Sequence, residues 1–234
     1  MLVELYVMNV KGLDLNDSRN FSMISEERKE KVENYLHDND KKLSLGAGLL
    51  LNYGLKRRIE GIDLPINFKR NKNGKIQLWN YPSVYVNLSH SQEYAVCAVS
   101  SCEIGVDIER CDSRISNCLE LAKQYFHPRE YEDILHTPLE QQRGRFFEFW
   151  VLKECYLKAI GRGLYEPLNS FFIKLDSKIT ICQQLNKKTY SFQLFPNYMD
   201  SYKLAVCAES ETLNIRLIEV SAKIVLKELL EGQV

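Results

Sequence analysis

The feature of this sequence that most constrains the fold is an uninterrupted helical pattern in its second half. Residues 147–160 contain no Pro or Gly and are rich in helix formers, and the next residue, Gly161, can close a helix in a left-handed conformation. On a period of 3.6 residues, one stripe of this helix holds Phe147, Trp150, Val151, Glu154 and Lys158. The stripe is therefore apolar where it begins and changes to a carboxylate and an ammonium further along.

The carboxylate of Glu154 is expected to point toward the interior of the protein. A buried carboxylate is costly unless a cation, a metal ion or a network of donors compensates it. The alternative is an ordinary Glu–Lys pair, Glu154 with Lys158, at the edge of a buried helix face. A second acidic element elsewhere in the chain favours the first interpretation.

This second element lies on a predicted strand, residues 103–109. With a period of two, Asp107 and Glu109 share one face of the strand, while Val106 and Ile108 share the other. Two carboxylates about 7 Å apart on one face are suitable ligands for a hard divalent cation. A solvent-facing strand edge is the alternative. If Glu154 joins Asp107 and Glu109, the three supply the small number of carboxylates that a Mg²⁺ site needs.

Two further groups of residues could bind an anion. Ser25 is a plausible N-cap for a helix that carries Arg28 and Lys31 one turn apart, a spacing at which two cations can hold a phosphate. A solvated helix face is the alternative. Residues 84–91 form an apolar run that ends in polar side chains, including Ser89 and His90, which could donate to an anion or simply cap a turn.

Composition restricts the class of protein. The 31 basic and 31 acidic residues cancel, so no field of the whole molecule attracts nucleic acid or an anionic membrane. The seven Cys show neither a disulfide framework nor the spacing of a zinc site, which predicts reduced thiols in a cytoplasmic protein. The N-terminus does not resemble a signal peptide, and no apolar run approaches the roughly 18 residues of a membrane helix. The sequence thus predicts a soluble intracellular protein.

A short internal repeat predicts two halves. Residues 94–100 resemble residues 204–210, and each segment precedes another predicted strand, at 104–109 and 215–219 respectively. We interpret this as an α/β (α+β) fold of two similar halves, 1–110 and 111–234, although chance similarity of two hairpins is an alternative. Only the first copy has the acidic pair, so one metal site is expected. Ligands favour the interface between two such halves, and the site is expected there.

Three elements together resemble those of the Sfp-type 4′-phosphopantetheinyl transferases. Residues 105–109, Gly-Val-Asp-Ile-Glu, are similar to the family element G-x-D-x-E. Residues 150–163 are similar to W-x-x-K-E-x-x-x-K-x-x-G-x-G, and residues 87–91, Asn-Leu-Ser-His-Ser, to N-x-S-H-S. The elements occur in the family's order and spacing, and the chain length suits the two-halved form of the family, so the resemblance spans nearly the whole chain.

The resemblance implies a pseudo-twofold pair of α/β halves with coenzyme A in the cleft between them. The implied reaction moves 4′-phosphopantetheine from coenzyme A to a serine of a carrier protein and releases adenosine 3′,5′-bisphosphate. Carried over residue by residue, the Mg²⁺ ligands are Asp107, Glu109 and Glu154, and the contacts to coenzyme A are Arg28, Lys31, Lys42, Lys75, Ser89 and His90. Glu154 also becomes the candidate base, and Lys158 is placed to balance charge on the departing phosphate.

The sequence departs from the family pattern at two of these positions. Ile76 follows Lys75 where the family has Pro in a G-K-P element, and Lys42 aligns with a family cation only through a one-residue gap. The resemblance also places an acyl or peptidyl carrier protein on the segment Cys111–Tyr131. It leaves the identity of the carrier open, and a monomer is sufficient for the site.

Two other functions are consistent with the same carboxylates. A Mg²⁺-dependent nucleotide or pyrophosphate hydrolase would release the bisphosphate without any acceptor protein. A non-catalytic module that binds coenzyme A or a carrier would bind without turnover, but retaining three converging carboxylates without a metal would be destabilising.

Overall fold

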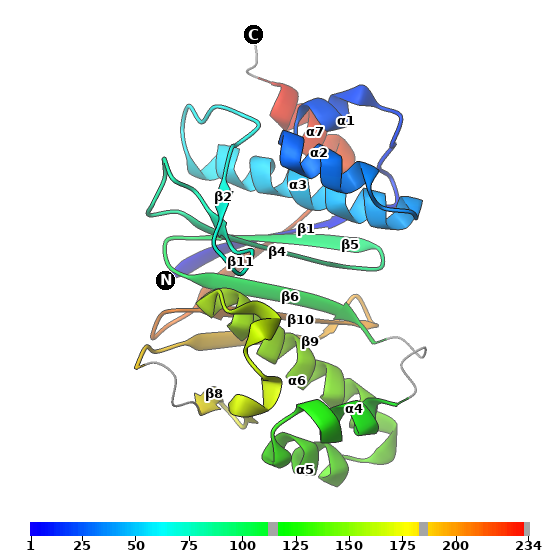
Figure 1. The fold of residues 1–234 in the computed structure, drawn as a ribbon, viewed down its shortest axis with the longest axis vertical. Coiled ribbons are helices and arrows are strands. Elements are labelled where there is room, and N and C mark those ends of the chain that lie inside the picture. The colour runs from blue at the N-terminus through cyan, green and yellow to red at the C-terminus, as the bar shows by residue number, and fades with distance from the viewer. Residues whose placement is uncertain (112–116, 183–186, 232–234) are drawn as a thin grey trace. The chain divides into compact units, whose positions relative to one another are not determined.

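Two long helices, α3 (Asp38–Arg58) and α6 (Leu139–Ile160), organise the computed structural model, which describes residues 1–111, 117–182 and 187–231 (Figure 1). Each helix belongs to a different compact unit. The α3 unit contains Leu2–Arg70, Ile76–Ser101 and the chain from Asn214 onward, and the α6 unit contains Asn71–Lys75 and Cys102–Leu213.

The α3 unit is built on a four-stranded sheet with the order β11-β1-β5-β4. Its strands are β1 (Leu2–Asn9), β4 (Tyr85–Ser91), β5 (Tyr94–Ser100) and β11 (Asn214–Val220). β1 pairs in parallel with β11 and antiparallel with β5, which also pairs antiparallel with β4. Helix α3 packs on β5, and Figure 1 shows the shorter helices on the same side of the sheet: α1 (Ser18–Ser22), α2 (Glu26–Glu33) and α7 (Ala222–Leu230). A two-stranded ribbon completes this unit with β2 (Lys69–Arg70) and β3 (Ile76–Gln77).

The α6 unit is built on an antiparallel sheet with the order β6-β10-β9. Its strands are β6 (Ile104–Arg110), β9 (Ser191–Tyr198) and β10 (Tyr202–Ala208). Helix α6 lies across β6 and β10, and its apolar residues form a core with α4 (Cys118–Tyr125) and α5 (Pro128–His136). The remaining elements are two 3₁₀ turns, Gly163–Tyr165 and Leu168–Ser170, and the hairpin of β7 (Phe172–Leu175) and β8 (Ile179–Cys182).

The predicted class of two similar α/β halves is confirmed at the level of these units. Each unit packs one long helix on a sheet in which a central strand, β5 or β10, lies between two antiparallel neighbours. Strand β5 coincides with the first segment of the sequence repeat, 94–100, and β10 contains most of the second, residues 204–208. Helix α6 begins before the predicted residue 147 but ends as predicted, with Gly161 in the left-handed region at φ 69°.

The compact units change at Cys102, and the two strands of each repeat do not pair with each other. β5 and β6 are consecutive in the chain but do not pair, because β6 pairs with β10 in the α6 unit. In the same way, β11 follows β10 in the chain but pairs with β1 of the α3 unit. Each repeat is thus a strand followed by a crossing to the other unit.

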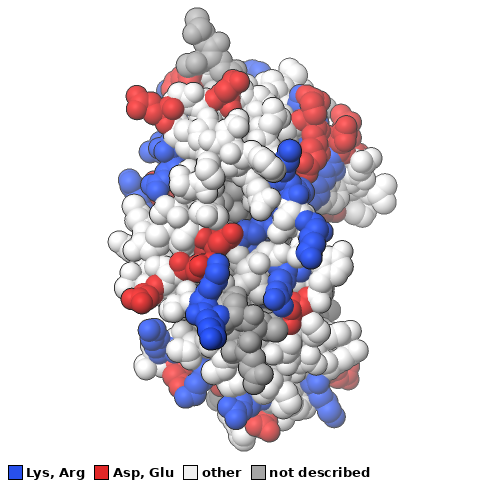
Figure 2. Space-filling model, turned by 60° about the vertical axis from the view of Figure 1, so that its left-hand side comes forward, with Lys and Arg blue, Asp and Glu red and all other residues white. Residues whose placement is uncertain are grey.

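The 31 basic and 31 acidic residues of the chain include many side chains on the surface. Acidic and basic side chains are interspersed on the face that Figure 2 shows. Within residues 1–111, 117–182 and 187–231, no helix has the length and apolar character needed to cross a membrane.

Candidate functional site

The carboxylate site begins where the backbones of β6 and α6 touch. A Cβ atom added to Gly105 would lie only 1.8 Å from the carbonyl oxygen of Cys155 and 2.6 Å from the amide nitrogen of Ala159. No side chain fits between these backbones, so glycine allows this approach of strand to helix. Because side chains alternate along a strand, residues 107 and 109 face α6 together with residue 105.

Asp107 is the first acidic residue on this face, and it is 3% exposed. Its Oδ1 accepts a hydrogen bond of 2.6 Å from Nζ of Lys158, which also donates to the carbonyl oxygen of Val106 at 3.2 Å. Burial opposes the charge on Lys158, but the carboxylates of Asp107, Glu154 and Glu109 outweigh it and raise the pKa of Lys158. The structure therefore gathers these three carboxylates around one ammonium.

Glu154 lies one turn before Lys158 on α6. Its Oε1 is buried and accepts no hydrogen bond from any described residue. Burial raises the pKa of Glu154, the negative charge of Asp107 raises it further, and Lys158 opposes the effect. A buried carboxylate oxygen without a donor, beside a second carboxylate, is a place where a further cation would be stabilising.

The donor set fits a hard divalent cation, since it consists of carboxylate oxygens. Glu109 is half-buried and shares the α6 face of β6 with Asp107. Among the described residues, however, no group of three or more His, Cys, Asp or Glu side chains already has metal-binding geometry. Asp107 instead has Lys158 as its cation.

A buried ion pair between Lys153 and Glu130 holds α6 in place next to Glu154. Lys153 is fully buried, and its Nζ donates to both carboxylate oxygens of Glu130 at 2.7 Å and to the carbonyl oxygen of Phe171 at 3.0 Å. Glu130 also accepts hydrogen bonds from the backbone nitrogens of Ile173 and His127. Burial lowers the pKa of Lys153 to about 8, against the charge of Glu130. The pair joins α6 to the start of α5 and to the segment that leads into β7.

Lys75 belongs to the turn between β2 and β3, and its ammonium contacts the C-terminal end of α6. Its Nζ donates to the carbonyl oxygens of Ala159 and, at 3.4 Å, Ile104, and it pairs with Glu103. Burial lowers the pKa of Lys75 although Glu103 opposes this effect. The ammonium predicted to contact coenzyme A thus has three oxygen acceptors within the protein.

The cationic residues of α2 lie in the α3 unit. The pKa of Lys31 is lowered by burial and by the positive charges of Arg28 and Arg70. The charges of Arg28 and Arg70 therefore both act on Lys31, and no sequence pattern relates Arg70 to α2. Lys42, predicted for the same group, donates to the carbonyl oxygen of Lys11 at 3.2 Å.

The chain is similar to known proteins over most of its length. The model of the 4′-phosphopantetheinyl transferase superfamily matches residues 103–207, and that of the N-terminal part of 4′-phosphopantetheinyl transferase matches residues 16–102. The 4′-phosphopantetheinyl transferase gsp of Aneurinibacillus migulanus is 35% identical over 190 residues, which cover 80% of this chain and 77% of the relative. The chain belongs to the 4′-phosphopantetheinyl transferase superfamily.

A second relative and a solved structure are also similar to the chain. The 4′-phosphopantetheinyl transferase Sfp of Bacillus subtilis strain 168 is 32% identical over 193 residues, which cover 82% of this chain and 85% of the relative. The crystal structure of a holo-(acyl-carrier-protein) synthase from Bacillus anthracis in complex with coenzyme A is 18% identical, with a TM-score of 0.41, and covers 47% of this chain and 97% of that one.

Ser89 and His90 of the transferase lie near the end of β4, opposite Val96 and Ala95 of β5. Ser89 is buried and His90 is exposed. Both belong to the α3 unit, as do Arg28 and Lys31.

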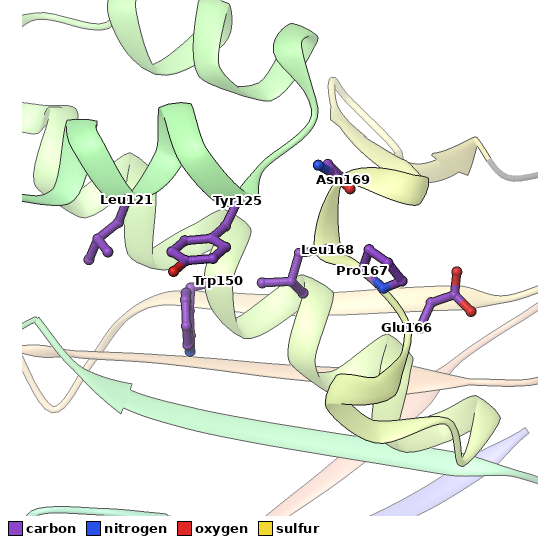
Figure 3. A pocket seen from close by; sticks show the side chains of 7 residues that line it. All are labelled: Leu121, Tyr125, Trp150, Glu166, Pro167, Leu168 and Asn169. Atoms are coloured by element: carbon purple, nitrogen blue, oxygen red, sulfur yellow. The ribbon is translucent and has the colours of Figure 1, made fainter.

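The α6 unit of the transferase also has a cavity of about 440 Å³, lined by Leu121, Tyr125, Trp150, Glu166, Pro167, Leu168 and Asn169. In Figure 3 the ring of Tyr125, from α4, lies over Trp150, from α6, and Leu168 points toward both. Trp150 is one turn before Glu154 on the same stripe of α6. From the sequence, Trp150 belongs to the apolar stripe of the helix and to the element 150–163, and neither pattern predicts a cavity beside it. The segment Cys111–Tyr131 contributes Leu121 and Tyr125 to the wall, while its residues 112–116 lie outside the described residues.

Proposed function

We propose that this protein transfers 4′-phosphopantetheine from coenzyme A to a serine hydroxyl of an acyl or peptidyl carrier protein. The observation that carries the proposal is the meeting of Asp107 with Glu154 and Lys158 across the contact of β6 and α6, in a chain that belongs to this superfamily. Asp107 contacts Lys158, which lies 51 positions later in the sequence, and its charge acts on Glu154, 47 positions later. Together these residues supply groups that phosphoryl chemistry needs.

In the proposed reaction, the serine oxygen attacks the phosphorus that bears the pantetheine arm. A new P–O bond forms, the bridging P–O bond of the pyrophosphate breaks, and adenosine 3′,5′-bisphosphate leaves. Glu154 accepts the serine proton, a role that suits a carboxylate whose pKa is raised by burial and by Asp107. Lys158 offsets the negative charge that grows on the departing phosphate.

Asp107, Glu109 and Glu154 would hold Mg²⁺, since their oxygens suit a hard cation and Oε1 of Glu154 accepts no hydrogen bond from a described residue. When bound, the ion polarises the pyrophosphate and offsets its charge. Arg28 and Lys31 would attract the phosphates of coenzyme A, with Ser89 and His90 as donors from β4. Lys42 and Lys75 remain predicted contacts, and both would first have to leave the acceptors described above.

The pKa of Glu154 gives a test of the metal site. In the metal-free protein a raised folded-state pKa means that the carboxyl holds its proton more tightly when folded. This stabilisation is fully present below the unfolded pKa, whose ordinary value is 4.5, and is lost as the pH rises through the folded-state pKa. We expect the melting temperature of wild type to fall relative to that of Glu154→Gln across this window, and Mg²⁺ to raise it again only in wild type. Equal Mg²⁺ shifts in both proteins, measured by calorimetry, would place the ion elsewhere.

The acceptor surface is proposed on the segment Cys111–Tyr131. Tyr125 is 47% exposed and lines the cavity beside Trp150, so an apolar side chain of the carrier could bury it. We expect Tyr125→Asp to raise KM for the carrier by about tenfold, equivalent to 1.4 kcal/mol, without changing the Kd of coenzyme A. Leu139→Asp is the matched control, because Leu139 is 80% exposed and does not line the cavity. An unchanged KM for Tyr125→Asp would move the carrier to another surface.

The activity is tested by mass spectrometry of apo carrier proteins after incubation with the protein, coenzyme A and Mg²⁺. Addition of the pantetheine arm to a serine is the expected result. Release of the bisphosphate at the same rate without a carrier would indicate a hydrolase, and tight binding without turnover would indicate a binding module. Sedimentation is expected to show a monomer, and the seven cysteines, which form no disulfide bonds, suit a reducing cytoplasm.

A further inference from the structure

The turn between β2 and β3 covers the C-terminal end of α6. Asn71 shapes this turn, since its Oδ1 accepts hydrogen bonds from the backbone nitrogens of Asn73 at 2.9 Å and of Lys75 at 3.0 Å. Gly74 has a φ of 87°, a conformation that favours glycine. These features fix the turn so that the side chains of residues 71, 73 and 75 all reach the end of α6.

The three side chains bind backbone oxygens at the end of α6, where a helix has no further turn to bind them. Nδ2 of Asn73 donates to the carbonyl oxygen of Gly161 at 2.7 Å, and Nδ2 of Asn71 donates to the same oxygen at 3.4 Å. Nζ of Lys75 donates to the carbonyl oxygen of Ala159. The positive charge of Lys75 also suits the negative end of the helix dipole. The turn therefore caps α6 from a part of the chain 84 to 90 positions earlier in the sequence.

The ammonium of Lys75 also contacts β6. Nζ donates to the carbonyl oxygen of Ile104 at 3.4 Å, and it pairs with Glu103, the residue directly before this strand. Ile104 precedes Gly105, where the backbone of β6 touches that of α6. One ammonium thus holds a carbonyl oxygen of the strand and a carbonyl oxygen of the helix beside the closest approach of the two elements. We call these contacts of Lys75 with Glu103, Ile104 and Ala159 the Lys75 clamp.

The position of the Lys75 clamp bears on the carboxylate site. Lys158 is adjacent to Ala159 in α6, and Asp107 follows Gly105 on the same face of β6. If β6 and α6 separated here, the hydrogen bond of 2.6 Å between Asp107 and Lys158 would lengthen. The clamp opposes this separation because it joins both backbones. A displacement of about 1 Å in an active site can cost on the order of 10²-fold in rate.

We propose that Lys75 is a positioning residue for the transfer reaction, because it clamps β6 to the end of α6 and so holds Asp107 against Lys158 and beside Glu154. This inference rests on the proposed function, since it concerns the same carboxylate site. It is an alternative to the contact with coenzyme A that the family resemblance implies for Lys75. Such a contact would require the ammonium of a side chain that is 9% exposed to give up Glu103 and two carbonyl oxygens.

Kinetics and calorimetry test this role with Lys75→Met, which keeps an unbranched side chain and removes the ammonium. We expect kcat for transfer to a carrier protein, at saturating coenzyme A and Mg²⁺, to fall on the order of 10²-fold. The Kd of coenzyme A, measured by calorimetry without Mg²⁺, should stay within about twofold of wild type. The assay temperature is kept well below the melting temperature of each variant, so that loss of folded protein does not lower kcat.

Two variants of the same turn are matched controls. Lys72→Met makes the same chemical change at an exposed position and should have wild-type kcat. Asn73→Ala removes a hydrogen bond to Gly161 but leaves the Lys75 clamp in place. It should speed hydrogen exchange in the last turn of α6 without lowering kcat, whereas Lys75→Met should speed exchange in β6 as well.

Glu103→Gln tests the clamp without changing Lys75. It removes the anionic partner of the ammonium at a partly exposed position, and it should lower kcat by about fivefold with an unchanged Kd of coenzyme A. This variant decides the question if Lys75→Met does not fold, because wild-type kcat in Glu103→Gln would then overturn the proposal.

Three other results would overturn the role of Lys75. One is wild-type kcat in folded Lys75→Met. Another is a Kd of coenzyme A weakened by about tenfold or more, which would identify Lys75 as a substrate contact. The third is a loss of kcat in Asn73→Ala or Lys72→Met equal to that in Lys75→Met, which would make the clamp irrelevant.

These outcomes are distinct from failure of the proposed function. If wild type does not add the arm to a carrier protein, the proposed function fails, and the exchange measurements still test whether Lys75 joins β6 to α6. If wild type transfers the arm and folded Lys75→Met does so at the same rate, only the role of Lys75 is wrong.

Discussion

Glu154→Gln should lower kcat for transfer by about 10³-fold or more while leaving the Kd of coenzyme A within about tenfold of wild type. The amide has nearly the same shape but cannot accept the serine proton, and it is a poor ligand for a divalent cation. Substrate binding should survive, because the contacts proposed for the phosphates of coenzyme A include Arg28 and Lys31 on α2, which this substitution does not touch. Single-turnover kinetics and calorimetry measure the two quantities separately.

Glu140→Gln is the matched control for this experiment. It makes the same chemical change in the first turn of α6, at an exposed position. It should have wild-type kcat and wild-type affinity. An equal loss of turnover and of coenzyme A binding in Glu154→Gln would contradict the proposed role and make Glu154 a binding or structural residue.

Gly105→Ala should remove at least about 3 kcal/mol from the free energy of unfolding, at the upper end of what overpacking costs. The added methyl would lie 1.8 Å from the carbonyl oxygen of Cys155, which belongs to the backbone of α6 and cannot rotate away. Strand and helix would have to separate, and Asp107 would move away from Lys158 and Glu154. Urea unfolding followed by circular dichroism measures the change, and activity should be lost even in the fraction that remains folded.

Gly144→Ala controls for the change of residue type. A Cβ atom there meets nothing closer than Nζ of Lys203 at 3.6 Å, an ordinary contact. Since Gly144 lies inside α6, alanine should raise the stability by about 0.5–1 kcal/mol. Wild-type stability of Gly105→Ala would show that β6 and α6 are not in backbone contact.

Local pattern was enough to predict the elements that carry the site. The end of α6 follows from Gly161, and the shared face of Asp107 and Glu109 follows from the period of a strand. That Glu154 faces inward follows from its stripe. These are properties of a few consecutive residues, and they are present in the sequence before any tertiary contact is known.

The parts that could not be predicted depend on long-range pairing. Whether β6 follows β5 into the same sheet is decided by packing against α6, which lies about forty residues later. Arg70 was missed because neither its neighbours in sequence nor its spacing relates it to α2. Lys42 has the positive charge expected of a phosphate contact. The direction of its side chain could not be predicted from the sequence, and its ammonium donates to the carbonyl oxygen of Lys11.

The parallel pairing of β1 with β11 has a consequence for synthesis of the chain. During translation, strand β1 keeps an open edge until residues 10–213 have been made, and only then can Asn214–Val220 cover it. A nascent chain therefore carries this unprotected strand edge until β11 has been made. Fragments cut near residue 110 would keep the same defect permanently, so they should aggregate rather than fold as separate halves.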